Sequence, residues 1–87
     1  MEVIYITQNI IDIRSFHQYQ SGHIPGAKSI EKYELLKNPA KYLNKEKIYY
    51  IYCNSGIQSK VVVQKLNSIG YSTVNIDGGY YNYLLRN

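Results

Sequence analysis

The sequence predicts one α/β domain, residues 1–87, with a mostly parallel central sheet of about five short strands and helices on both faces. Three observations support this prediction. Short apolar runs alternate with stretches of helical spacing along the chain. Residues 48–52 are apolar on both faces, which is typical of a central strand covered on both sides. The 87 residues suffice for a single modest core.

Five short segments have the composition of strands. They are residues 3–6, 10–13, 27–30, 48–52 and 72–76. In a parallel sheet the ligand site lies beyond the carboxyl ends of the strands. A reactive side chain of the site is therefore expected directly after a strand.

Five helices are expected between and after these strands, and capping or turn residues set their ends. They are residues 15–19, 31–36, 40–43, about 60–69, and 80–85. Ser15 is expected to cap the first helix. Pro39 separates the second helix from the third, because proline disfavours helical backbone at the residue before it. Gly70 is expected to end the fourth helix.

Composition and charge exclude several classes of protein. The formal net charge is +4, but the lysines are spread along the chain, so no nucleic-acid partner is expected. A single cysteine excludes an internal disulfide, and no metal or cofactor is implied. No apolar run approaches the roughly 18–20 residues that a membrane span needs. We expect a soluble, cytoplasmic protein without a membrane partner.

Cys53 is the candidate nucleophile, because it follows the most apolar strand and precedes a helix. A thiol in that position faces unpaired backbone N–H groups and the positive end of the helix dipole, which favour the thiolate. Gly56 allows the next residues to curl so that successive N–H groups point inward around an anion. The alternative is a buried cysteine that only packs, since free cysteine behaves as a small apolar side chain.

Three ordered motifs resemble those of the rhodanese-like single-domain sulfurtransferases, from about residue 10 to residue 83. The first consists of D-I-R at residues 12–14 and G-H-I-P-G-A at residues 22–27. The second is C-N-S-G-I-Q-S at residues 53–59, similar to the family pattern C-x-x-G-x-R-S. The third is I-D-G-G at residues 76–79, with Tyr83 where the family usually has tryptophan. The resemblance implies the family's three-layer α/β fold.

The resemblance also implies a reaction. The thiolate of Cys53 would take a sulfane sulfur from a small anionic donor, thiosulfate or a persulfide, and hold it as a persulfide. An acceptor would then remove the sulfur: cyanide, a thiol such as thioredoxin or glutathione, or a sulfur-carrier protein. The residues implied to bind the persulfide are Asn54, Ser55, Gly56, Ile57, Gln58 and Ser59.

Two positions depart from the family pattern and leave this loop without formal charge. Gln58 stands where the family commonly has arginine, and Asn54 stands where many thiosulfate-using members have a basic residue. Turnover of thiosulfate is therefore expected to be poor, with Arg14 or Lys60 as other possible sources of charge. An alternative function is a rhodanese-like binding or regulatory module with weak catalysis. The presence of both Cys53 and Gly56 argues against that alternative.

The remaining polar candidates are expected to support the site. Asp12 and Arg14 lie on one face of their strand, where they can pair with each other. His23 is expected to hold its own loop, and His17 to be solvated. Phosphatase chemistry is not expected, because the required arginine clamp is replaced by Ser59.

Overall fold

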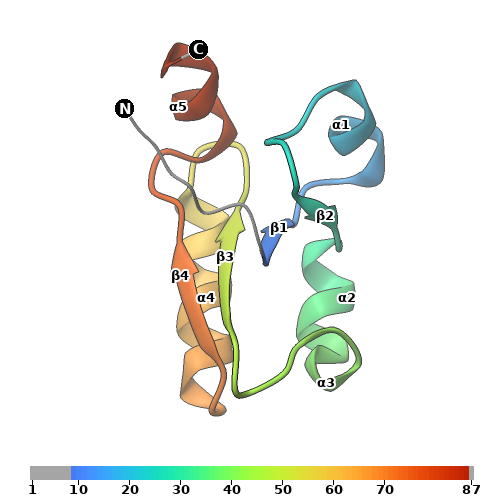
Figure 1. Cartoon of the computed structure of the whole chain (residues 1–87), viewed down its shortest axis with the longest axis vertical. Helices are drawn as coiled ribbons and strands as arrows, with labels where there is room; N and C mark the ends of the chain where they lie inside the picture. Colours follow the sequence, from blue (N-terminus) through green and yellow to red (C-terminus); the bar gives the residue numbers. More distant parts are fainter. Residues whose placement is uncertain (1–8, 87) are drawn as a thin grey trace.

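The computed structural model describes residues 9–86 and contains a parallel sheet (Figure 1). The sheet has the order β2-β1-β3-β4, and every strand pair is parallel. The strands are β1 (Ile10–Asp12), β2 (Lys28–Ser29), β3 (Ile48–Tyr52) and β4 (Ser72–Asn75). This part of the chain has four strands rather than about five, and the remaining expected strand, residues 3–6, lies outside the described residues.

Helices alternate with these strands, as predicted. They are α1 (Phe16–Ser21), α2 (Lys32–Lys37), α3 (Pro39–Tyr42), α4 (Ile57–Ser68) and α5 (Gly79–Arg86). Ser15 caps α1, since its Oγ accepts a hydrogen bond from the N–H of Gln18 at 3.2 Å. None of the helices within residues 9–86 is long and apolar enough to cross a membrane.

The start of α4 was predicted about three residues too late. Residues 57–59 form the first turn of the helix rather than the end of a loop. The reason is Gly56, whose φ of 90° is in the left-handed region and turns the chain directly into the helix. This early start places the first N–H groups of α4 close to the end of β3.

Alternating side chains of the strands form two cores, one on each face of the sheet. The larger core contains Ile11 and Ile51 and is covered by α2 and α4, which contribute Leu35, Val62 and Leu66. The smaller core contains Ile10 and Tyr52 and is covered by Tyr19 of α1, Ala27 and Tyr80. Helices thus cover both faces, which confirms the predicted three-layer α/β class.

The carboxyl ends of β3 and β4 face one end of the molecule. β3 and β4 both point toward the end where α1 and α5 lie, and α4 starts there (Figure 1). The N–H groups of Tyr80 and Tyr81 donate to the carbonyl oxygens of Cys53 and Asn54, each at 2.9 Å. α5 therefore fixes the backbone that carries the candidate nucleophile.

Candidate active site

Cys53 follows β3 directly, and its side chain belongs to the larger core with 6% of its surface exposed. The chain reverses at Gly56 before it enters α4. A Cβ atom at this position would lie 2.8 Å from the backbone nitrogen of Gly78, and the left-handed backbone would itself be strained. Glycine at this position therefore allows the backbone to fold over the thiol.

Backbone and side-chain groups surround the sulfur atom. The N–H groups of Gly56 and Ser59 donate to Sγ of Cys53 at 3.2 and 3.3 Å. The thiol in turn donates to Oγ of Ser59 at 3.4 Å. Burial raises the pKa of Cys53, but hydrogen bonds from Ser59 and from the N–H groups of Gly56 and Ser55 outweigh it, so the pKa lies below its ordinary value. The site thus favours the thiolate, the reactive form of cysteine.

The side chain of Asn75 holds Ser59 and Gly56 in place through hydrogen bonds. Ser59 is fully buried, and its hydroxyl donates to Oδ1 of Asn75 at 2.5 Å. Nδ2 of Asn75 donates to the carbonyl oxygen of Gly56 at 3.1 Å and to Oδ1 of Asp77 at 2.9 Å. Asn75 was not predicted as a site residue, although it lies at the carboxyl end of β4, where parallel sheets place their sites.

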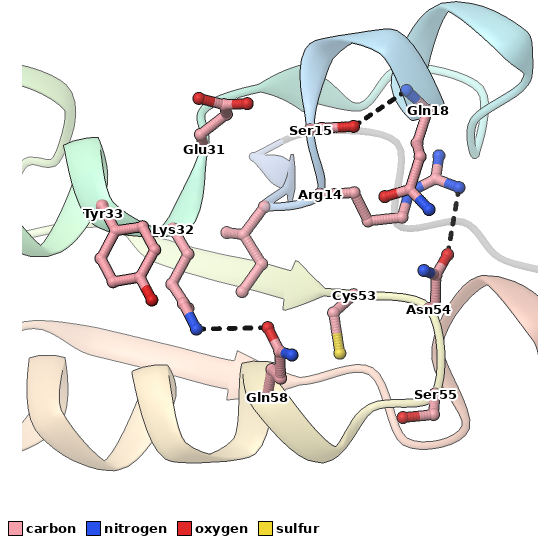
Figure 2. A pocket seen from close by; sticks show the side chains of 11 residues that line it. Arg14, Ser15, Gln18, Glu31, Lys32, Tyr33, Cys53, Asn54, Ser55 and Gln58 are labelled. Carbon is pink, nitrogen blue, oxygen red and sulfur yellow. Dashed lines mark hydrogen bonds between the residues drawn. The ribbon is translucent and has the colours of Figure 1, made fainter.

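A cleft of about 420 Å³ leads to Cys53 (Figure 2). Among the residues predicted for the site, the cleft is lined by Arg14, Cys53, Asn54, Ser55 and Gln58. The other lining residues come from the segment after β1, from α1 and from the start of α2: Ile13, Ser15, Gln18, Glu31, Lys32 and Tyr33. A volume in this range suits a small organic molecule.

The other predicted site residues lie outside the cleft wall. Gly56 and Ser59 are buried beneath the sulfur atom. Ile57 is 72% exposed and lines a neighbouring apolar groove. Lys60 is exposed and does not line the cleft, and Asp12 is fully buried. Lys60 is therefore not placed to supply charge to the cleft.

Asp12 and Arg14 form a buried ion pair beside the cleft. Asp12 accepts hydrogen bonds from Nε and Nη2 of Arg14 at 3.0 and 2.7 Å and from the hydroxyl of Tyr52 at 2.7 Å. Burial, followed by this hydrogen bond, raises the pKa of Tyr52, so its hydroxyl remains a donor. Arg14 also donates to the carbonyl oxygen of Gly22 at 2.6 Å and to Oδ1 of Asn54 at 3.4 Å. The pair connects three chain segments, and Asp12 neutralises the positive charge of Arg14.

Neither histidine lines the cleft. Nδ1 of His23 lies 2.9 Å from the carbonyl oxygen of Tyr19. The imidazole ring of His23 also stacks on the phenol ring of Tyr19, with the ring centroids 3.8 Å apart. His17 is exposed on α1. This placement gives no Cys–His pair with Cys53. Within residues 9–86, no three His, Cys, Asp or Glu side chains are grouped so that they could hold a metal ion.

The lowered thiol pKa leads to a prediction for alkylation by iodoacetamide. Only the thiolate reacts, so the rate rises as pH increases through the pKa, and a lowered pKa moves this rise to lower pH. We expect the midpoint for folded protein to lie below that for protein unfolded in urea. In the thiolate form the hydroxyl of Ser59 can rotate from Asn75 and donate to the sulfur, which lowers the pKa of Cys53. Ser59→Ala removes this donor and should move the midpoint to higher pH.

Ser55→Ala is the matched control, because it keeps the backbone N–H that faces the sulfur. Its midpoint should equal that of the unsubstituted protein. Equal midpoints for the folded and the unfolded chain would contradict a thiolate-stabilising site.

Comparison with known proteins agrees with this geometry. A family model described as rhodanese-like domain matches residues 4–85. Thiosulfate sulfurtransferase PspE of Escherichia coli is 32% identical over 77 residues, which cover 87% of this chain and 74% of PspE. The Bacillus subtilis protein YrkF is 35% identical over 66 residues, 76% of this chain but 35% of YrkF. The crystal structure of SSP1007 from Staphylococcus saprophyticus superposes with a TM-score of 0.80 at 36% identity, covering 86% of this chain and 74% of SSP1007. This chain therefore belongs to the rhodanese-like domain family.

Proposed function

We propose that this protein is a sulfurtransferase that carries sulfane sulfur on Cys53 as a persulfide. The observation that supports the proposal most directly is the environment of Sγ, which accepts hydrogen bonds from the N–H groups of Gly56 and Ser59 at the floor of the cleft. These groups stabilise an anion on sulfur without a general base. The name of PspE, a thiosulfate sulfurtransferase, supports the same class of reaction.

In the loading step, the thiolate of Cys53 attacks the outer sulfur of the donor. A bond forms between Sγ and that sulfur, and the bond between the two donor sulfurs breaks. Its electron pair leaves with sulfite when the donor is thiosulfate, or with a thiolate when the donor is an organic persulfide. A proton carried by an organic persulfide passes to the leaving thiolate or to water.

In the transfer step, a nucleophilic acceptor attacks the outer sulfur of the Cys53 persulfide. The sulfur leaves with the acceptor, and the electron pair of the broken bond restores the thiolate. Cyanide, glutathione, thioredoxin and a sulfur-carrier protein are all suitable acceptors in this chemistry. We also propose a reducing, cytoplasmic setting, because Cys53 must remain a thiol between turnovers.

The proposal favours a persulfide donor over thiosulfate. None of the residues from Asn54 to Ser59 carries a charge, and the guanidinium of Arg14 already pairs with Asp12. A dianion such as thiosulfate therefore lacks the charge-assisted, two-pronged hydrogen bonds that an arginine at position 58 would give.

Intact mass spectrometry tests the loading step. The protein is incubated separately with thiosulfate and with glutathione persulfide. We expect a gain of about 32 Da, the mass of one sulfur atom, that is faster with glutathione persulfide and is reversed by cyanide. Cys53→Ala should show no gain.

An absence of sulfur loading would overturn the proposal. If folded, reduced protein gains no sulfur from either donor, the protein is not a sulfurtransferase of this kind. A binding or regulatory module of the same family would then be the better explanation.

A further inference from the structure

Lys32 lines the cleft at the start of α2, opposite the first turn of α4. Its Nζ donates a hydrogen bond to Oε1 of Gln58 at 3.3 Å (Figure 2). The same ammonium group lies 4.7 Å from the ring centroid of Tyr33. Two segments that are 26 residues apart in sequence thus meet at the cleft beside Cys53.

Lys32 differs from Arg14 and Lys60 in two ways. It lines the cleft, and within residues 9–86 its positive charge is not paired with a carboxylate. Arg14 is 8% exposed and its guanidinium is paired with Asp12. Lys60 does not line the cleft. Among residues 9–86, no carboxylate lies within 4.0 Å of the Lys32 ammonium group. Lys32 can therefore offer its charge and its other N–H groups to a ligand.

Glu31 also lines the cleft, but at a different position. Oε2 of Glu31 accepts a hydrogen bond from the N–H of Phe16 at 3.4 Å, and Figure 2 shows its carboxylate on the α1 side of the cleft.

The hydrogen bond from Lys32 also orients the side-chain amide of Gln58. With Oε1 turned to Lys32, the amide nitrogen lies on the side of Cys53, as Figure 2 shows.

We propose that Lys32 and Gln58 form a subsite for the anionic oxygen group of the sulfur donor. Lys32 supplies the positive charge and Gln58 supplies an N–H donor nearer to Cys53, but without the rigid two-pronged geometry of an arginine at position 58. The ligand chemistry is an oxyanion in the same molecule as the sulfane sulfur: the carboxylate of an organic persulfide or the sulfonate of thiosulfate. This inference rests on the proposed sulfurtransferase function.

The test compares Lys32→Ala with Lys60→Ala, a matched loss of one lysine outside the cleft. Rates of sulfur loading on Cys53 are measured against the concentration of three donors. Glutathione persulfide and thiosulfate carry a carboxylate or sulfonate and are here called the anionic donors, whereas the persulfide of 2-mercaptoethanol carries neither group. For the anionic donors we expect Lys32→Ala to raise KM about 3- to 10-fold with little change in kcat, since the group is partly solvated. Loading by the persulfide of 2-mercaptoethanol should not change.

Two further variants test the charge at position 32 and the amide at position 58. Lys32→Arg should restore KM, and Gln58→Glu should raise KM for anionic donors because it places a carboxylate in the subsite. A change confined to glutathione persulfide identifies the carboxylate as the ligand, and a change confined to thiosulfate identifies the sulfonate.

Two outcomes overturn the inference. One is equal KM values for Lys32→Ala and Lys60→Ala with both anionic donors. The other is an equally large effect of Lys32→Ala with the persulfide of 2-mercaptoethanol. In either case, loading of the unsubstituted protein would leave the sulfurtransferase function intact, whereas an absence of loading from every donor would overturn both proposals.

Discussion

Replacing Arg14 by alanine is expected to lower the free energy of unfolding by about 3–5 kcal/mol, as is typical when one partner of a buried ion pair is removed. Asp12 is 0% exposed and receives three side-chain hydrogen bonds from Arg14, two from Nε and one from Nη2. Without the guanidinium, a buried carboxylate loses its counter-ion and retains as donors the hydroxyl of Tyr52 and the backbone N–H of residue 14. Urea denaturation followed by circular dichroism measures the loss.

Lys41→Ala is a matched control for this prediction. It removes the ion pair between Lys41 and Glu34, whose side chains are 63% and 43% exposed and whose charged atoms are 4.0 Å apart. Exposed pairs of this kind contribute at most about 1 kcal/mol. If Arg14→Ala destabilises the protein no more than Lys41→Ala does, the buried pair is not a major source of stability.

Gly79→Ala is expected to decrease kcat/KM for sulfur transfer by about 100-fold, because small displacements of catalytic groups have effects of this size. Gly79 has φ of 59°, and an added Cβ would collide with the carbonyl oxygen of Cys53 and lie 2.6 Å from that of Asn54. These two carbonyls accept hydrogen bonds from the N–H groups of α5. The methyl group should therefore displace the backbone next to the sulfur and lower stability by about 1–3 kcal/mol.

Gly70→Ala separates backbone strain from displacement of the site. Gly70 also has positive φ, 101°, but an added Cβ would contact only the flexible end of Lys45. This variant should lose stability and keep its kcat/KM, measured under conditions in which both variants are fully folded. Equal activity of the two glycine variants would show that Gly79 does not position the catalytic backbone.

Much of the fold could be predicted because its signals are local. The apolar run of β3 gave the bounds Ile48–Tyr52 correctly, and Ser15 caps α1 as its residue type suggested. The start of α4 was missed because its first turn lacks an apolar face: Ile57 is exposed, and the buried residue is the polar Ser59, whose N–H donates to the thiol. The family motifs located Cys53 and the loop that follows it.

The side-chain contacts across the site could not be predicted in the same way. Lys32 meets Gln58 through the packing of α2 near α4, and nothing in the sequence around Lys32 indicates this contact. Asn75 reaches Ser59 across 16 residues of chain. Arg14 was considered as a source of charge, but its hydrogen bonds to buried Asp12 show a supporting position whose charge is already compensated. Such contacts depend on tertiary geometry rather than on local pattern.

The hydrogen bonds to the sulfur of Cys53 couple its ionisation to folding. Because the pKa of the thiol is lower in the folded protein, the unfolded chain binds more protons in the interval between the two pKa values. Stability therefore increases with pH through this interval, is fully gained above the pKa of the unfolded chain, and is lost as pH falls through that of the folded protein. The ionised thiol and the fold thus stabilise each other: the native backbone favours the thiolate, and the thiolate favours the native backbone.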